Sequence, residues 1–262
     1  PSQGEGIGRD RDVRIVSKQE VAPGHFQMRL ACLDEAPDVS PGQFLHLWLP
    51  GRADPLLRRP YTVYRTRDDG LDILFQAVGK GSSLLAGLEI GATVRVAWPL
   101  GEGFALPPEG ATAIVVGGGV GMASLYLLIE RLSLASVPTL VFLGTRSADY
   151  VLCRQEIEAL GVPLRVATDD GSEGFHGFVT ELAASVLDGE KPEAPHVYAC
   201  GPTPMMRALT EVVASRVIPT QVALENRMGC ALGFCLGCVV PVRTGEDVSY
   251  QRVCIEDRKS VV

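Results

Sequence analysis

Residues 112–125 read TAIVVGGGVGMASL, an apolar run that ends in glycines and leads into a segment with helical spacing. A continuous apolar run followed by apolar residues three to four apart predicts a strand, a tight turn and a helix. Glycines in such a turn let backbone N–H groups and the helix N-terminus approach a pyrophosphate. Because Met122 stands where a dinucleotide fingerprint needs its third glycine, an ordinary strand–helix turn is the alternative.

The same alternation of apolar strands and amphipathic helices continues to residue 225 and predicts a doubly wound parallel sheet. We expect helices at 122–135, 152–160, 178–187 and 203–215, and strands at 112–119, 139–144, 164–170, 196–201 and 220–225. Ligands of such sheets bind at the carboxyl ends of the strands. The segment CGPTPMM at 200–206 follows one strand, so it should face the same crevice as the glycines.

Two glycine-containing loops therefore form the candidate site for a nicotinamide dinucleotide. Cys200 is a candidate for positioning the nicotinamide ring, and its alternative role is that of a small buried thiol. The candidate binding residues are Gly117, Gly118, Gly119, Gly121, Cys200, Gly201 and Pro202.

Residues 12–98 are typical of β-structure, with short runs rich in β-branched and aromatic residues between turn signals such as Pro41-Gly42. Six strands at this spacing predict a small antiparallel barrel. A short helix is expected at 82–88. The expected strands are 13–21, 25–33, 43–50, 61–66, 71–78 and 92–98.

The barrel half carries residues suited to a flavin nucleotide in the segment LLRRPYTV, 56–63. Arg59 can form paired hydrogen bonds with a pyrophosphate, and Thr62 can donate to a phosphate oxygen. Tyr61 can lie against an isoalloxazine ring. The glycine loop VGKGSSLL at 78–85 offers a second phosphate cradle. An ordinary barrel strand with an exposed arginine is the alternative for the first segment.

Four of the seven cysteines fall in the last 33 residues, with the spacing C-x4-C-x2-C-x15-C. Plant-type [2Fe-2S] proteins use C-x4-C-x2-C followed by a distant fourth cysteine. Small residues such as Gly229 and Gly237 let the loop backbone approach the inorganic sulfides. A four-cysteine zinc site is the alternative, although zinc knuckles prefer two CxxC pairs and only one is present. The candidate ligands are Cys230, Cys235, Cys238 and Cys254.

Composition excludes several classes of protein. Hydrophobic residues make up 46% of the chain and charged residues 21%, which is an ordinary globular balance. The net charge of -7 and the absence of a basic patch argue against nucleic-acid binding. No apolar run approaches the ~20 residues that span a bilayer. The first residues lack the apolar core of a secretory signal, so we expect a cytoplasmic protein.

Changes in pattern near the Pro107–Gly110 linker and near Glu225 divide the chain into three expected parts. They are an FAD-binding barrel at 1–106, an NAD-binding α/β domain at 107–225 and a [2Fe-2S] module at 226–262. In the last part, CVVPVRTG at 238–245 and DVSYQRVC at 247–254 predict two short strands.

The motifs RPYT, GKGS, PLGEGF, GGGVG, TDDGS and CGPTPMM, followed by the cysteine loop, resemble in this order the ferredoxin–NADP reductase superfamily. More closely, the chain is similar to electron-transfer subunits of class B dihydroorotate dehydrogenase, and ENRMGCALGFCLGC at 225–238 is the most specific part. The resemblance covers residues 12–254. It implies cluster ligation by the four cysteines, and FAD contacts at Arg59, Pro60, Tyr61, Thr62, Leu74, Phe75, Gln76, Gly81 and Ser82.

The resemblance also implies a function. Such subunits take hydride from NADH onto FAD and pass single electrons through the cluster to a partner that carries FMN and oxidises dihydroorotate in pyrimidine biosynthesis. A heterotetramer with two copies of each subunit is expected. One alternative is a related subunit serving another dehydrogenase, a hydrogenase or a ferredoxin, and another is a zinc-stabilised binding subunit without catalysis.

Three departures from the family pattern stand out. Gln76 occupies a position where arginine is common, and Met122-Ala123-Ser124 replaces a stretch that contains proline. The tail IEDRKSVV after Cys254 lacks the usual continuation.

Two finer expectations concern specificity and docking. Arg146 stands after a strand end without a second basic neighbour and with Asp149 nearby, which favours NADH over NADPH. Leu232, Phe234 and Leu236 either form an apolar docking patch around the cluster or pack inward against residues 239–253.

Overall fold

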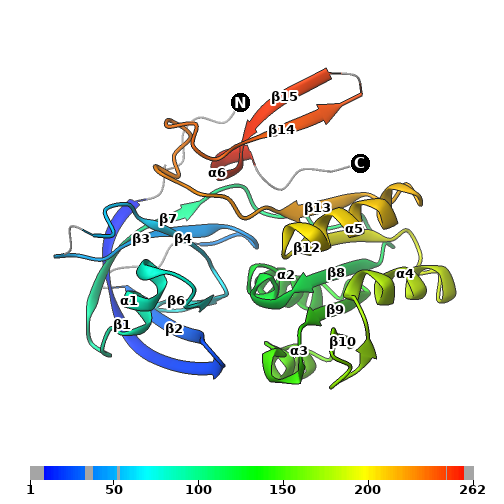
Figure 1. Cartoon of the computed structure of the whole chain (residues 1–262), viewed down its shortest axis with the longest axis horizontal. Coiled ribbons are helices and arrows are strands. Elements are labelled where there is room, and N and C mark those ends of the chain that lie inside the picture. The colour runs from blue at the N-terminus through cyan, green and yellow to red at the C-terminus, as the bar shows by residue number, and fades with distance from the viewer. Residues whose placement is uncertain (1–8, 33–37, 52–53, 246, 257–262) are drawn as a thin grey trace. The chain divides into compact units, whose positions relative to one another are not determined.

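A computed structural model describes residues 9–32, 38–51, 54–245 and 247–256 (Figure 1). These residues fall into two compact units. Of the described residues, the first unit contains 9–20, 24–103 and 224–256, and the second consists mainly of residues 104–223. The cysteine-rich segment belongs to the same unit as the barrel strands, and its separation as a third part stays a prediction.

The first unit contains a seven-stranded sheet in the order β4-β3-β7-β1-β2-β6-β5, and its recorded pairs are antiparallel. Alternating apolar residues build its core, and Val13 of β1 lies opposite Val94 of β7 with both side chains completely buried. Burying such a side chain contributes about 1.5–3 kcal/mol. The strands are β1 Arg9–Ala22, β2 His25–Cys32, β3 Phe44–Trp48, β4 Arg59–Thr62, β5 Arg65–Arg67, β6 Gly70–Gln76 and β7 Thr93–Leu100.

The sheet has one strand more than the sequence predicts, because the run expected at 61–66 divides into β4 and β5. The backbone N–H of Val63 bonds to Gln43 on the β3 side, whereas that of Tyr64 bonds to Asp72 of β6. The chain therefore exchanges one partner strand for another within two residues. This change of partner brings the ends of the sheet together into a barrel.

Helix α1, Lys80–Ala86, starts two residues before the expected position. The Ser82 hydroxyl accepts hydrogen bonds from the backbone N–H groups of Val78 and Gly79, at 3.0 and 3.1 Å. The bond from Gly79 satisfies an N–H group at the start of the helix, whereas the Val78 N–H also bonds to the Gln76 carbonyl at 3.1 Å.

The second unit contains a six-stranded parallel sheet in the order β11-β10-β9-β8-β12-β13. The chain order reverses between β8 and β12, so the sheet is doubly wound as predicted. The two-residue strand β11 was not expected from the sequence. The strands are β8 Ala113–Gly118, β9 Thr139–Thr145, β10 Leu164–Thr168, β11 Phe175–His176, β12 His196–Cys200 and β13 Thr220–Ala223.

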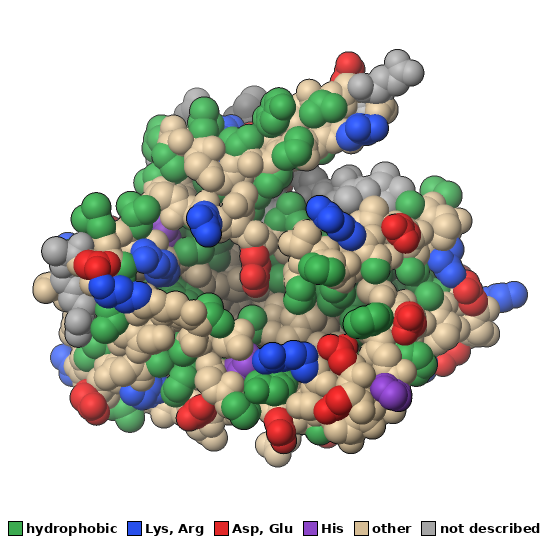
Figure 2. Space-filling view, in the orientation of Figure 1, with side chains coloured by type: hydrophobic (Ala, Val, Ile, Leu, Met, Phe, Trp, Pro, Cys, Tyr) green, Lys and Arg blue, Asp and Glu red, His purple; other side chains and the backbone are tan. Residues whose placement is uncertain are grey.

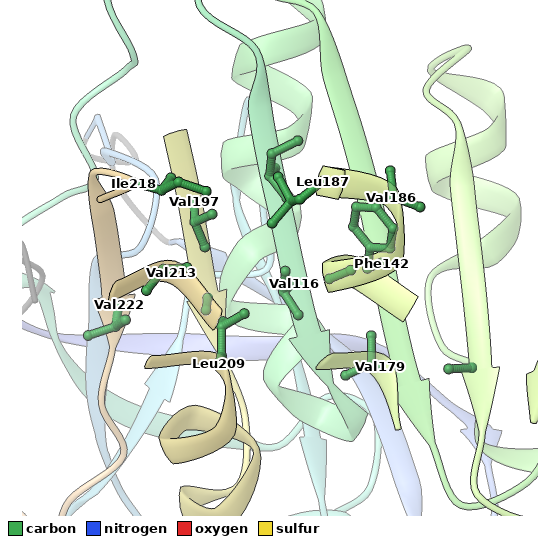
Figure 3. Close-up of a cluster of buried hydrophobic side chains, with 14 residues drawn as sticks. Val116, Phe142, Val179, Val186, Leu187, Val197, Leu209, Val213, Ile218 and Val222 are labelled. Atoms are coloured by element: carbon green, nitrogen blue, oxygen red, sulfur yellow. The ribbon is translucent and has the colours of Figure 1, made fainter. Parts of the chain in front are cut away.

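Helices cover this sheet in two contacting pairs, α2 with α3 and α4 with α5. Figure 3 shows the buried cluster formed by α4, α5 and the sheet, in which Phe142 and Val116 lie among aliphatic side chains. The helical segments are η1 Gly119–Met122, α2 Ala123–Leu134, η2 Ala148–Tyr150, α3 Arg154–Ala159, α4 Val179–Gly189 and α5 Thr203–Ala214.

The cysteine-rich segment continues into the hairpin β14 Val239–Thr244 and β15 Asp247–Arg252, which is followed by α6 Val253–Glu256. The strand expected at 247–254 therefore ends two residues early, and Cys254 lies on a helical turn. The Glu256 carboxylate accepts a hydrogen bond from the Arg252 backbone N–H at 2.5 Å, which stabilises this turn. The tail beyond residue 256 lies outside the described residues.

Candidate redox site

The four C-terminal cysteines lie in two neighbouring pairs. The thiols of Cys230 and Cys235 contact each other, as do those of Cys238 and Cys254. None of the seven cysteines, all of which the structure describes, forms a disulfide. Within the described ranges, no three His, Cys, Asp or Glu side chains form a group of the kind that holds a single metal ion.

Backbone N–H groups point at the sulfur atoms of this loop. The N–H groups of Leu232 and Cys235 lie 3.3 and 3.4 Å from the Cys230 Sγ, and that of Gly237 lies 3.4 Å from the Cys235 Sγ. Burial acts to raise the pKa of Cys230, but these backbone donors outweigh it and lower the pKa to about 7. Burial raises the pKa of Cys254 to about 12, with a further contribution from Cys238. Cys230 therefore lies in surroundings that favour a thiolate.

The loop reaches this arrangement through unusual backbone angles. Ala231 and Leu236 have φ values of 57° and 56°, in the left-handed region that side chains other than glycine rarely adopt. Such conformations persist where the surrounding structure enforces them and are concentrated at functional sites. A Cβ at Gly229 would lie 3.3 Å from the Cys235 sulfur, so the backbone passes close to that thiol.

The loop rests on the outside of the barrel. Phe44 of β3 and Leu100 of β7 form one buried cluster with Cys238 and Cys254. Cys254 is only 1% exposed, whereas Cys235 is exposed at the surface. The barrel wall thus supports the second pair of thiols and leaves part of the first pair accessible.

The three apolar loop residues have different surroundings. Leu232 packs against the buried cluster of Phe44 and Leu100. Phe234 and Leu236 are 77% and 60% exposed. Leu232 therefore packs inward, whereas Phe234 and Leu236 remain at the surface. Figure 2 shows hydrophobic side chains gathered on the part of the surface formed by the cysteine-rich segment and its hairpin.

The two segments predicted to bind flavin meet in the first unit. A Cβ at Gly81 would lie 3.0 Å from the Arg59 Nε, so the arginine crosses the start of α1. The Tyr61 ring makes an edge contact with Phe75 at 5.3 Å between centroids. Burial raises the pKa of Tyr61 to about 12, so its hydroxyl remains protonated.

The side chains of several other predicted flavin contacts are buried or already hydrogen-bonded. Leu74 and Phe75 are buried in the barrel, and the Ser82 hydroxyl already caps α1. Gln76 ends β6 opposite His25. Pro60 and Thr62 lie on β4 opposite His46 and Phe44.

The two glycine loops predicted to bind dinucleotide lie side by side in the second unit. Cys200 pairs with Gly117 across the neighbouring strands β12 and β8, so both loops leave the same sheet edge. A Cβ at Gly121 would lie 2.5 Å from the Cys200 carbonyl oxygen. Gly119 has a φ of 53° and open space where a Cβ would stand. Close packing therefore accounts for Gly121, whereas Gly119 leaves its backbone free to be approached by a ligand.

Gly118 and Gly201 of this edge pack against one methionine, Met205, whereas Gly117 packs against Met122. A Cβ at Gly118 would lie 2.6 Å from the Met205 sulfur and 2.7 Å from Pro202, and one at Gly201 would lie 2.5 Å from the Met205 methyl. The Cys200 side chain is 0% exposed. Its role beside a nicotinamide ring stays a prediction.

The donor set suits a cluster with two irons. Such a cluster takes four thiolates, two for each iron, and the cysteines of this loop are already grouped in pairs. Donors aimed at sulfur are the groups that stabilise an iron–sulfur centre. The sequence did not single out His46 and Phe44, which carry the loop on β3, because their run FLHLW is an ordinary strand pattern. His46, a polar residue within that apolar run, was the feature of the sequence that could have indicated a functional position.

Comparison with known proteins identifies two regions of the chain. Residues 225–256 match the model described as the iron–sulfur cluster binding domain of dihydroorotate dehydrogenase B. Residues 115–211 match the oxidoreductase NAD-binding domain.

Proteins that are similar to nearly the whole chain are named as subunits of the same enzyme. The electron transfer subunit of dihydroorotate dehydrogenase B (NAD(+)) from Desulforamulus reducens is 37% identical over 94% of each chain. That from Bacillus caldolyticus is 38% identical over 95% of each chain. A solved NADH-dependent reduced ferredoxin–NADP oxidoreductase, studied for flavin-based electron bifurcation, is 27% identical with a TM-score of 0.82, covering 99% of this chain and 90% of that one.

The fold and the cysteine loop define an iron–sulfur oxidoreductase of the ferredoxin–NADP reductase type, with FAD, a [2Fe-2S] cluster and NADH as its cofactors and reductant. The chain belongs to the family of electron transfer subunits of dihydroorotate dehydrogenase B. In the part of the chain that the structure describes, no helix is long and apolar enough to cross a membrane.

Proposed function

We propose that this chain collects electrons from NADH and delivers them one at a time to the FMN of a dihydroorotate dehydrogenase catalytic subunit. The observation that carries the proposal is the pairing of Cys230 with Cys235 and of Cys238 with Cys254, on a loop carried by the flavin-type barrel. When bound, FAD would supply a centre that exchanges either a hydride or single electrons, and a [2Fe-2S] cluster would supply a one-electron carrier.

The chain's own residues hold and orient these groups. The four cysteines ligate the irons, and the loop N–H groups stabilise their sulfurs. Arg59 and the start of α1 hold the FAD pyrophosphate, while Tyr61 supports the ring system. The backbone around Gly119 and the Cys200–Pro202 loop receive the nicotinamide dinucleotide. No side chain has to act as an acid or base, because the protein positions the rings and excludes water.

The partner is a catalytic subunit that oxidises dihydroorotate, in an assembly with two copies of each chain. The exposed Phe234 and Leu236 flank the exposed Cys235 and supply an apolar contact where electrons leave. We assign the complex to the cytoplasm.

Reconstitution tests this function. The loaded chain, mixed with the FMN-containing catalytic subunit from the same organism, should support NAD⁺ reduction by dihydroorotate, whereas the catalytic subunit alone should not. A loaded, folded chain that neither assembles with that subunit nor changes its NAD⁺ activity would rule out this partner. A related subunit that serves another acceptor would then be the better assignment.

A further inference from the structure

His46 is a buried histidine on the barrel wall that carries the cysteine loop. It lies in the middle of β3 and is only 2% exposed. It is directly opposite Pro60 of β4 and Ala97 of β7. Because directly opposed residues of antiparallel strands point to the same face, these three side chains share one face of the wall.

That face is the one that the cysteine loop covers. Ala97 packs against the buried cluster that contains Cys238 and Cys254. Phe44, two residues before His46 on the same strand, belongs to that cluster. The ring of His46 itself lies beside the backbone of Cys230. The histidine is therefore between the strand with the flavin-type residues and the first cysteine of the loop.

One ring nitrogen of His46 lacks a partner. Its Nε2 is buried and has no hydrogen bond within the described residues, although the Cys230 backbone is close enough to influence the ring. A buried polar atom without a partner destabilises the fold, because the hydrogen bond to water that it has lost is not replaced. A neutral histidine ring carries one N–H donor, and a donor on Nε2 would be buried here without an acceptor among the described residues.

We propose that His46 is a positioning residue of the iron–sulfur centre, and that its Nε2–H is directed at the Cys230 end of the cluster and raises the reduction potential there. The inference rests on the proposed ligation of the cluster by the four cysteines. Reduction adds negative charge to a cluster, and a hydrogen-bond donor at its sulfurs stabilises the reduced state. The same side chain fills the space between the flavin strand and the loop.

The test is a redox titration of the purified, loaded chain, followed by electron paramagnetic resonance. His46→Phe keeps an aromatic ring but removes the donor, whereas His46→Gln keeps an N–H donor. We expect His46→Phe to disfavour reduction of the cluster about tenfold, which is 59 mV for a one-electron couple. His46→Gln should restore most of this shift. Val96→Ala, a fully buried change on β7 next to Leu47, should leave the potential unchanged.

A second readout can be taken on the wild-type protein, so it does not require a variant to fold. In wild-type protein labelled with ¹⁵N-histidine, the reduced cluster should show a magnetic coupling to a histidine nitrogen, and His46→Gln should abolish it. Absence of the coupling, or equal potentials in wild type and His46→Phe, would overturn the role of His46 while leaving the cluster in place. A wild-type protein without iron and sulfide would instead refute the proposed function itself.

Discussion

The backbone N–H of Cys254 lies 3.5 Å from the Sγ of Cys238, although 15 residues separate these cysteines in the chain. The hairpin β14–β15 makes this approach possible by returning the chain to the point where it left the loop. A [2Fe-2S] cluster needs this closure, because the second iron takes one thiolate from the loop and one from a distant segment.

The first prediction concerns cofactor content. The purified chain should carry one FAD and one [2Fe-2S] cluster, since the paired cysteines and the Arg59–Gly81 contact occur in the same unit. Iron, acid-labile sulfide and flavin analyses, together with a visible spectrum, measure this directly. About one zinc per chain without iron would support the zinc-stabilised alternative instead.

The second prediction separates two cysteines by their burial. Cys235→Ser should abolish the cluster but spare NADH oxidation by artificial two-electron acceptors, because its exposed side chain supports no core. Cys254→Ser should also abolish the cluster, and in addition destabilise the chain by about 1–3 kcal/mol, because it leaves a hydroxyl in an apolar cluster. Iron content measures the loss of the cluster in both variants, and thermal unfolding measures the difference in their stability. Equal stabilities of the two variants would contradict the structural role of Cys254.

The third prediction concerns the packing of the glycine loop. Gly121→Ala should destabilise the second unit by about 1–3 kcal/mol and raise the KM for NADH, because its Cβ would meet the Cys200 carbonyl at 2.5 Å. Flavin and iron contents should not change. Gly189→Ala in α4 is the matched control, since its Cβ would meet nothing within 4 Å. A Gly121→Ala variant with normal stability and KM would show that the two loops separate easily.

The fourth prediction is a preference for NADH over NADPH. The Arg146 guanidinium lies over the Tyr150 ring, 4.9 Å from its centroid, and Asp149, three residues further along the chain, is exposed. An arginine engaged with an aromatic ring and close in sequence to a carboxylate is a poor site for a 2′-phosphate. Comparing kcat/KM for the two dinucleotides tests this preference, and Asp149→Asn should narrow the difference. A clear advantage for NADPH in the wild type would contradict it.

The fifth prediction concerns docking of the partner. Phe234→Asp should weaken assembly with the FMN-containing subunit while leaving reduction of FAD by NADH near normal, because the side chain is exposed and far from the glycine loops in sequence. Size-exclusion chromatography and stopped-flow flavin reduction measure the two effects. Leu134→Asp, an equally exposed apolar position at the end of α2, should assemble normally. Full assembly of a loaded Phe234→Asp chain would place docking elsewhere.

The sequence by itself determined the classes of structure and the cofactor set. The apolar run that ends at Gly117–Gly119 and the helical spacing after it are local patterns, and local periodicity reports directly on strands and helices. The spacing of Cys230, Cys235 and Cys238 is also a local pattern, because these three cysteines lie in one short segment. The first pattern predicts the doubly wound sheet and the second predicts the iron–sulfur loop, while the short β-rich runs at 12–98 predict the barrel.

Local patterns failed where distant segments meet. The run at 61–66 divides because Val63 bonds to the β3 side and Tyr64 to β6, a change of partner that depends on barrel closure. The strand predicted at 247–254 ends at Arg252, because the Glu256 carboxylate accepts a hydrogen bond from the Arg252 backbone N–H and stabilises a helical turn there.

Only the tertiary structure decided which side chains the cysteine loop meets. It brought His46, Phe44 and Leu100 beneath the loop, partly buried Leu232, and left Phe234 and Leu236 exposed. These relationships depend on strand register and on the face that each residue presents, and a shift of one residue would reverse every face. Sequence spacing records which residues alternate along a strand, but not which distant segment covers each face.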